Sequence, residues 1–375
     1  MSDFQPFVME RTMSKFEQTV EYNLSESGVH PVPLSELLAD DPDHINCLLA
    51  TGLNYPHVNG LPELRDRIAA LYDGARPENV LVTVGAAEAN YLTVRTLLSA
   101  GDEIVVMLPN YMQIWGIAKN HGLEVRTFNL REEIGWAPDL SELSEAVTPK
   151  TKLIAVCNPN NPTGRILTEE EMDAVVAASE RAGAWLLADE VYRGAERVAI
   201  EESPSFYGRY EKTVAVGSLS KAYGLPGLRI GWVVCPTPIV DEIWARHEYV
   251  AISASMLSNK LAEIALSDEV RPRLIKRTRD FIRGGYSILE RWMETHGNVL
   301  SLTPPQAGAI AFVRYNLDVS STVFTERLRK EKSVLIVPGE HFGMDKLVRI
   351  SFGLPQDYLV PALDRIHELI TALKS

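Results

Sequence analysis

Seven short apolar runs, separated by longer amphipathic stretches, restrict the fold of this chain more than any other feature of its sequence. The runs lie between residues 79 and 234, and Gly, Pro, Asn, Asp or Ser follows each of them within two residues. Their hydrophobicity is continuous rather than alternating, which is typical of strands that are covered on both faces. We therefore expect an α/β fold with a seven-stranded, mostly parallel sheet flanked by helices. The expected strands are 79–84, 104–108, 123–128, 152–157, 184–188, 213–217 and 230–234.

Helical patterns lie between several of these strands, and the pattern changes past about residue 250. A helix over 86–99 follows the first strand, and a helix over 168–182 begins at a capping box formed by Thr168 and Glu171. The later part alternates helical and strand-like stretches, which predicts a smaller α+β domain. Its expected elements are a charged helix over 258–295 with a break at Gly284-Gly285, strands at 309–315, 334–337 and 347–352, and a closing helix from Tyr358.

These patterns predict three parts of the chain. Residues 51–255 form a large ligand-binding domain, and residues 256–375 form a small C-terminal α+β domain. Residues 1–50 look irregular and fit neither domain alone, so we expect them to pack on the small domain.

Composition excludes several classes of protein. Lys and Arg number 37 and Asp and Glu number 50, so the formal net charge of −13 argues against nucleic-acid and anionic-membrane partners. The sequence has no apolar run long enough to cross a membrane, and its N-terminus lacks the order of a signal peptide. The three cysteines lie far apart, which favours a reducing cytoplasm. No histidines have a zinc-binding spacing, so we expect no metal.

Polar residues that follow the strands carry the functional signal, because ligands of open α/β sheets bind beyond the carboxyl ends of the strands. Lys221 follows the strand at 213–217 in the sequence Ser218-Leu219-Ser220-Lys221. It is either a Schiff-base lysine with a lowered pKa or an ordinary loop lysine. Arg229 lies eight residues further on. With Ser218 and Ser220 it forms an anion clamp or, alternatively, a surface ion pair.

A turn of small residues follows the first strand. Gly85-Ala86-Ala87 lets backbone N–H groups at a helix start approach a phosphate, although a plain tight turn explains the same residues. Neither a P-loop nor a dinucleotide fingerprint is present, which disfavours a simple nucleotide enzyme.

Two further strand ends carry candidate residues. Asp189 ends the strand at 184–188, where it is either a helix cap or a buried anion facing a cationic ligand atom, and Tyr192 follows it. Asn161 lies in Asn158-Pro159-Asn160-Asn161-Pro162-Thr163-Gly164, which turn chemistry alone also explains.

The combination of these motifs is more specific than any one of them. The small-residue turn, the Asn-Pro turn, Ala188-Asp189-Glu190-Val191-Tyr192 and the Lys221 motif occur in that order, each at a strand end. Over roughly residues 50 to 370 the chain resembles the fold-type I pyridoxal-phosphate enzymes, and within them the class I/II aminotransferases.

The resemblance implies pyridoxal 5′-phosphate as cofactor and gives each motif a role. Lys221 would hold the cofactor as an internal aldimine and then move the proton at the substrate Cα. Asp189 would pair with the pyridinium nitrogen, and Tyr192 and Asn161 would bind the phenolic oxygen. The phosphate would be held by Ser218, Ser220, Arg229 and the backbone of Ala86 and Ala87.

Three further residues match the family outside these motifs, and a fourth, Gly28, lies in a segment that departs from the family pattern. Tyr111 matches the aromatic residue that stacks on the cofactor ring. Tyr55 matches the tyrosine that reaches the phosphate of a neighbouring subunit, which implies a homodimer with shared active sites. Arg349 matches the arginine that binds the substrate α-carboxylate, and an edge-strand arginine is the alternative. Gly28 is expected to lie against the substrate.

The sequence leaves the reaction and the substrate open. The segment 25–31 departs from the common family pattern and is similar to the capreomycidine synthase-like branch, whose members cyclise a hydroxylated arginine. An aminotransferase acting on an L-amino acid and a 2-oxo acid is the leading interpretation, and a lyase or cyclase acting on an arginine-derived amino acid is the alternative. A non-catalytic binding module would not require Lys221, Asp189 and Arg349 together. Glu26 suits a basic substrate side chain, whereas Trp115 or Tyr249 suits an apolar one.

Overall fold

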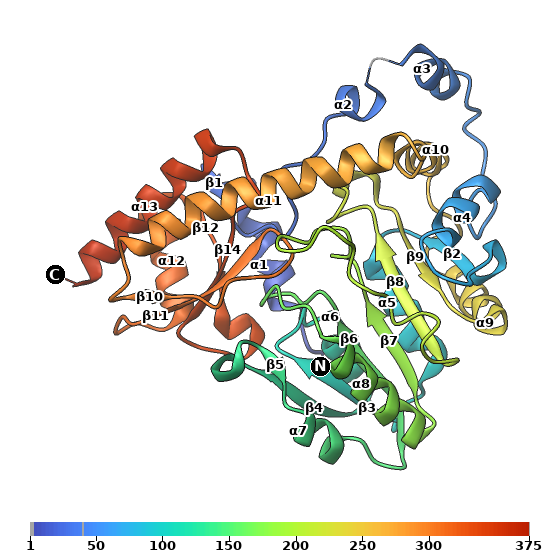
Figure 1. Cartoon of the computed structure of the whole chain (residues 1–375), viewed down its shortest axis with the longest axis horizontal. Coiled ribbons are helices and arrows are strands. Elements are labelled where there is room, and N and C mark those ends of the chain that lie inside the picture. The colour runs from blue at the N-terminus through green and yellow to red at the C-terminus, as the bar shows by residue number, and fades with distance from the viewer. Residues whose placement is uncertain (1–3, 40, 375) are drawn as a thin grey trace.

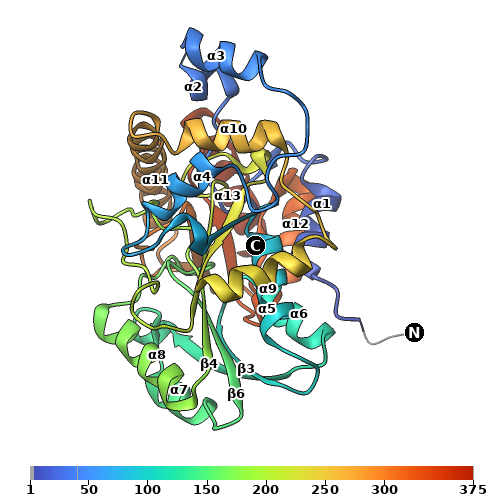
Figure 2. The same cartoon turned by 90° about the vertical axis from the view of Figure 1, so that its right-hand side faces the viewer.

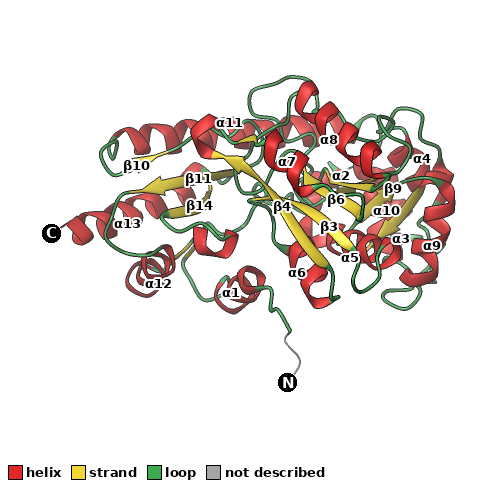
Figure 3. Ribbon diagram, turned by 90° about the horizontal axis from the view of Figure 1, so that it is seen from below, coloured by secondary structure: helices red, strands yellow, loops and turns green. Residues whose placement is uncertain are grey.

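Two sheets of different construction form the framework of the chain, with the large sheet at one end and the small one at the other (Figures 1 and 3). The computed structural model describes residues 4–39 and 41–374. Residues 1–3 and 40 of the expected N-terminal segment and residue 375 of the expected small domain therefore lie outside the described residues. The boundaries of the three expected parts stay a prediction.

The large sheet contains all seven expected strands, so the mostly parallel sheet is confirmed. Its strands are β2 (Val80–Thr83), β3 (Glu103–Leu108), β4 (Glu124–Arg131), β5 (Ala137–Pro138), β6 (Thr151–Cys157), β7 (Trp185–Asp189), β8 (Thr213–Ser218) and β9 (Gly231–Val234). They lie in the order β2-β9-β8-β7-β6-β3-β4-β5, and the neighbours from β8 to β4 are parallel. Strand β9 runs antiparallel to both of its neighbours. Strand β5 was not predicted, because two residues are too few to form a hydrophobic pattern.

Both faces of the large sheet are covered, as the continuous apolar runs predict. Val105 and Met107 of β3 pack in a cluster with helix α8 (Glu169–Ala182). The intervening Ile104 and Val106 pack on the other face in a cluster with three helices. These helices are α5 (Ala86–Leu97), α6 (Gln113–Asn120) and α9 (Thr237–His247), and Figure 2 shows them opposite α7 (Leu140–Ala146) and α8.

The predicted capping box of α8 is present. The Thr168 side chain accepts a hydrogen bond from the Glu171 backbone N–H, and the Glu171 carboxylate accepts one from the Thr168 N–H at 2.8 Å. Each side chain thereby satisfies a helix-end donor that has no partner within the helix.

The expected α+β tail forms a second, antiparallel sheet. Its strands lie in the order β10 (Leu300–Ser301), β11 (Ile310–Tyr315), β14 (Leu347–Ser351) and β13 (Val337–Pro338). The expected strand at 334–337 is divided in two, because β12 (Val334–Leu335) pairs elsewhere and only β13 joins this sheet. Helices α12 (Ser321–Lys332) and α13 (Gln356–Lys374) pack on it, and α13 begins two residues before the expected Tyr358.

The N-terminal segment reaches the small sheet region, but it is more regular than expected. Strand β1 (Tyr22–Asn23) pairs in parallel with β12, so this segment packs on the C-terminal part of the chain as predicted. The expectation of an irregular segment was wrong for helices α1 (Val8–Phe16), α2 (Leu34–Leu38) and α3 (Pro42–Leu49). These helices escaped detection because each is short and α1 buries only Met9 and Met13.

The expected helix break at Gly284-Gly285 was also wrong. Helix α10 (Met256–Ala265) ends before residue 266, and α11 (Val270–Glu294) passes through both glycines as one long helix (Figure 1). A Cβ atom at Gly285 would overlap the backbone carbonyl of Phe352, whereas one at Gly284 would meet open space. Gly285 therefore permits close packing of α11 on the segment after β14. Within the described residues, no helix combines the length and the apolar character that crossing a bilayer requires.

Because Gly285 is closely packed and Gly284 faces open space, we predict opposite effects on stability for alanine substitutions at the two positions. We expect Gly285→Ala to lower the free energy of unfolding by about 1–3 kcal/mol, because the added methyl group must displace backbone. We expect Gly284→Ala to raise it by up to ~0.5–1 kcal/mol, because alanine loses less backbone entropy in a helix. Urea unfolding of both variants measures the effects, and equal values for the two would contradict this description of the packing.

Candidate active site

A cavity of about 520 Å³ lies at the carboxyl edge of the large sheet. Much of its lining comes from residues that follow β2, β3, β6, β7 and β8. These five strands run in the same direction, so the residues after them meet at one edge. The ligand position expected for an open α/β sheet is therefore where the cavity lies.

All but two of the site residues that the sequence predicted line this cavity. The predicted residues that line the cavity are Ala86, Ala87, Tyr111, Asn161, Asp189, Tyr192, Ser218, Ser220, Lys221, Arg229 and Arg349. Gly28 lies just outside, where an added Cβ would be 3.7 Å from Cδ of Lys221. Tyr55 lies apart from the cavity, and 81% of it is exposed in the single chain.

Asp189 places a buried carboxylate at the floor of the cavity. It ends β7 and is 6% exposed, and its Oδ2 accepts a hydrogen bond from Nδ2 of Asn90 at 2.9 Å. Burial raises the pKa of Asp189, and the hydrogen bond from Asn90 and the charge of Lys221 oppose that shift. A turn rather than a helix follows it, so the helix-cap alternative was wrong. A buried carboxylate of this kind favours a cationic ligand atom beside it.

Asn90 is a site residue that sequence reasoning missed. It lies on α5, is 1% exposed and lines the cavity, and its Oδ1 has no hydrogen-bond partner among the described residues. Its spacing from Ala86 and Ala87 is about one helical turn, which places it on the same helix face as the phosphate turn. That spacing was the signal that could have revealed it.

Donors for an anion gather at one corner of the cavity. Gly85 caps α5 with a φ of +77°, and a Cβ atom there would overlap the guanidinium of Arg229. The Ser218 hydroxyl accepts a hydrogen bond from the Ser220 backbone N–H at 2.9 Å. A guanidinium, two hydroxyls and the N-terminus of a 12-residue helix therefore share this corner, a combination that suits a phosphate group.

Lys221 combines a position in the cavity with a lowered pKa. It lines the cavity, and its ammonium group has no hydrogen-bond or ion-pair partner within the described ranges. Burial lowers the pKa of Lys221, and the charge of Arg349 lowers it further, although Glu26 opposes both. The lowered pKa leaves more of the amine neutral, which is the form that reacts with an aldehyde.

Arg349 brings a guanidinium from the small sheet into the same cavity. It is 2% exposed, and β14, which carries it, lies between β11 and β13, so the edge-strand alternative was wrong. Its Nη1 donates to Oδ1 of Asn161 at 2.9 Å, and its Nη2 donates to the backbone oxygen of Ser25 at 2.5 Å. Its Nε has no partner among the described residues. A buried guanidinium with a spare donor is suited to bind a carboxylate.

Two tyrosines and a cysteine complete the walls. Burial raises the pKa of Tyr192 and of Tyr111, and the Tyr111 hydroxyl donates to Oε1 of Glu10 at 2.7 Å. Cys157 lines the cavity, which goes beyond the strand packing expected of it. Burial raises the pKa of its thiol, so Cys157 is not a nucleophile at neutral pH.

Apart from Glu26, which the sequence offered for a basic substrate side chain, the residues of the N-terminal segment that line the cavity were not expected there. Glu10, Met13 and Glu17 line the cavity together with Glu26 and Ser27. The first three lie at helical spacing (i, i+3, i+7) and so share one face of α1 and its C-terminal end. The spacing is visible in the sequence, but only the fold shows which face meets the cavity.

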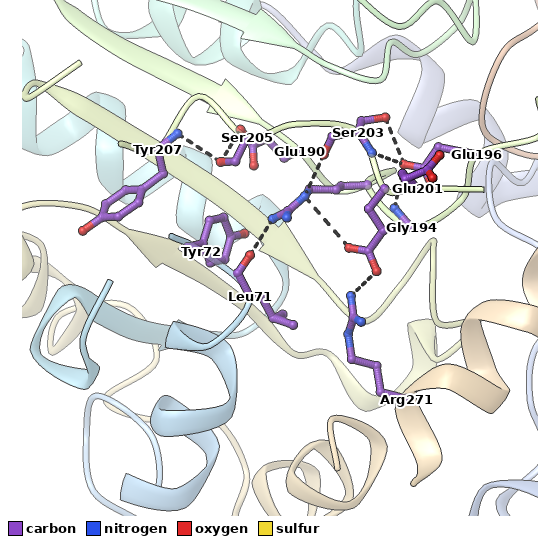
Figure 4. Close-up of polar contacts among 12 residues, drawn as sticks. Leu71, Tyr72, Glu190, Gly194, Glu196, Glu201, Ser203, Ser205, Tyr207 and Arg271 are labelled. Atoms are coloured by element: carbon purple, nitrogen blue, oxygen red, sulfur yellow. Dashed lines mark hydrogen bonds and ion pairs between the residues drawn. The ribbon is translucent and has the colours of Figure 1, made fainter. Parts of the chain in front are cut away.

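A polar network supports the end of β7 from the side away from the cavity (Figure 4). Oε1 of Glu190, the residue after Asp189, accepts hydrogen bonds from the Ser205 hydroxyl at 2.9 Å and the Phe206 N–H at 2.8 Å. Burial raises the pKa of Glu190 to about 7, although the charge of Arg193 opposes this. Arg193 in turn donates to the backbone oxygen of Leu71 at 2.9 Å. The network fixes the turn that carries Tyr192.

Comparison with known proteins relates this arrangement to one family. The family model for aminotransferase class I and II matches residues 49–366. Capreomycidine synthase from Streptomyces vinaceus is 32% identical over 354 residues, which cover 92% of this chain and 89% of that protein. An aspartate aminotransferase from Pyrococcus horikoshii is 27% identical, and the match covers 98% of each chain. The solved structure of a PLP-dependent aminotransferase from Streptococcus suis superposes with a TM-score of 0.93 at 32% identity, covering 100% of this chain and 99% of that one.

Proposed function

Because the chain belongs to the class I and II aminotransferase family, we propose that it transfers the α-amino group of an L-amino acid to a 2-oxo acid. The cofactor of this family is pyridoxal 5′-phosphate. One observation carries the proposal: a nucleophilic lysine, a buried carboxylate and a buried guanidinium, Lys221, Asp189 and Arg349, line a single cavity.

The residues of the cavity fit the cofactor. The corner formed by α5, Ser218, Ser220 and Arg229 suits its phosphate, and Gly85 leaves the space that the Arg229 guanidinium occupies there. The buried Asp189 suits a protonated ring nitrogen, since its carboxylate forms no ion pair with the residues that the structure describes. We assign contacts with the rest of the cofactor to Asn161, Tyr192 and Tyr111. When bound, pyridoxal phosphate supplies an aldehyde and a ring that withdraws electrons from the substrate Cα.

The chemical steps assigned to the chain fall on three residues. The neutral amine of Lys221 would hold the cofactor, and as a free base it would remove the proton from the substrate Cα. Asp189 holds the proton on the ring nitrogen, because a cation is favoured beside a buried carboxylate. Arg349 binds the α-carboxylate and so directs the Cα–H bond toward Lys221.

A lyase or cyclase is the second candidate, and the similarity to capreomycidine synthase favours it. Elimination and cyclisation also begin with removal of the Cα proton, so Lys221 and Asp189 would serve them equally. The two candidates diverge at the β-carbon, where elimination needs a leaving group. The difference is therefore in the product rather than in the residues named above.

We further propose a homodimer in the cytoplasm. Exposed apolar side chains around α3 and the α9–α10 connection support an interface there, among them Leu49, Leu53 and Tyr249, which are 80%, 80% and 92% exposed. Tyr55 lies in the same region of sequence and is free to reach a partner subunit. Cys47, Cys157 and Cys235 are all free thiols, which is in keeping with a reducing compartment.

Half-reactions of the loaded enzyme test the proposed function. With a single L-amino acid and no acceptor, we expect one equivalent of the corresponding 2-oxo acid per active site and no ammonia. Addition of a different 2-oxo acid should then restore the enzyme and yield its amino acid. Lys221→Ala serves as the control and should form no product. Release of ammonia, or a cyclic product without amino transfer, would support the second candidate instead.

Arg349→Lys separates substrate binding from cofactor binding. A lysine keeps the charge but loses the paired hydrogen bonds of a guanidinium. We expect kcat/KM for the amino acid to fall about 30- to 150-fold, equivalent to roughly 2–3 kcal/mol, while cofactor affinity changes little.

Arg229→Lys is the matched substitution. Because Arg229 is assigned to the phosphate, this variant should bind the cofactor more weakly than the unmodified enzyme does. Steady-state kinetics and a cofactor titration on both variants measure the two effects. Loss of cofactor from Arg349→Lys with unchanged amino-acid affinity would mean that the roles of the two arginines are exchanged.

A further inference from the structure

Three carboxylates face one side of the active-site cavity. Glu10 lies on α1, Glu17 directly follows that helix, and Glu26 lies in the next segment, and all three line the cavity. Glu10 accepts the hydrogen bond from Tyr111. Glu17 and Glu26 have no hydrogen-bond or ion-pair partner for their carboxylates within residues 4–39 and 41–374.

The cationic groups of the cavity are already committed to other partners. Its lining contains three of them, Lys221, Arg229 and Arg349. In the proposed function Lys221 attaches the cofactor, Arg229 binds the phosphate and Arg349 binds the α-carboxylate. Since Asp189 pairs with the ring nitrogen, the carboxylates of the N-terminal segment are left without a counter-charge. Two of these carboxylates, Glu17 and Glu26, also lack any hydrogen bond.

Independent features show that this cavity is built for a polar ligand. Arg349 is 2% exposed and Asn90 is 1% exposed. In the described part of the chain, Nε of Arg349 and Oδ1 of Asn90 nevertheless have no hydrogen-bond partner. Burial raises the pKa of Glu17, and the charges of Glu26 and Glu10 raise it further. The three carboxylates therefore repel one another. Glu26 and Glu10 also act on the charge of Lys221, which in the proposed function is attached to the cofactor.

We propose that the substrate is an amino acid with a cationic side chain, a guanidinium or an ammonium group, and that Glu17 and Glu26 bind that group. This inference rests on the proposed function, since it takes the cofactor and the α-carboxylate to occupy the other charged groups. A guanidinium presents a fork of donors that matches a carboxylate, so it suits the site best. A substrate with a side-chain carboxylate would meet only like charges at this wall, which separates this chain from enzymes that select aspartate.

Unreactive acids test the charge selectivity without requiring turnover. The probes are 5-guanidinovalerate, the neutral 5-ureidovalerate of nearly the same shape, and the dicarboxylate adipate. Titration calorimetry with the cofactor-loaded enzyme gives the dissociation constant of each. We expect the guanidino acid to bind at least tenfold more tightly than the ureido acid and adipate to bind most weakly.

Isosteric variants assign the effect to residues. The double variant Glu17→Gln, Glu26→Gln should lose most of the preference for the guanidino acid. The control is Glu21→Gln, which lies in the same segment but pairs with Arg365 at 2.7 Å away from the cavity, and it should keep the preference. Equal binding of the two acids, no detectable binding of either, or an unchanged preference in the double variant would overturn the proposal. Amino transfer without charge selectivity would refute this inference alone, and charge selectivity without amino transfer would refute the proposed function alone.

Discussion

The buried guanidinium of Arg349 is the interaction on which the active site depends. It extends from β14 of the small sheet, donates to Asn161 after β6 of the large sheet, and donates to the backbone oxygen of Ser25 in the N-terminal segment. A buried charge is costly unless it is paired or hydrogen-bonded, so loss of these contacts would destabilise the site. Residues of both sheets and of the N-terminal segment therefore meet at one cation. Its Nε has no partner among the described residues, and in our proposal it is available to the substrate carboxylate.

Different parts of the chain supply different residues of the active-site cavity. Residues that follow strands of the large sheet hold the cofactor in our proposal, and the N-terminal segment adds Glu10, Glu17 and Glu26 to the lining of the same cavity. Enzymes named as aspartate aminotransferases and as capreomycidine synthase both match this chain over most of its length.

The large sheet and most of the site could be predicted because both are encoded locally. Lys221 and Asp189 directly follow apolar runs, and a parallel sheet brings such residues to one edge. Gly284 and Gly285 were misinterpreted because a glycine pair resembles a helix break, whereas the carbonyl of Phe352 packs against Gly285 from far along the sequence. Glu10 and Glu17 could not be assigned, because their helical spacing does not reveal what their helix faces. Local sequence patterns predict the helices, the strands and the residues at strand ends. Only tertiary packing determines that Glu10 and Glu17 line the cavity as well.

Covalent attachment of the cofactor at Lys221 is the central claim of this account. Borohydride reduction of the cofactor-loaded enzyme, followed by peptide mapping with mass spectrometry, identifies the modified lysine directly. The account predicts a single reduced pyridoxyl-phosphate group on the peptide that contains Lys221. A map with Lys221 unmodified, or with the label on another lysine, would contradict it.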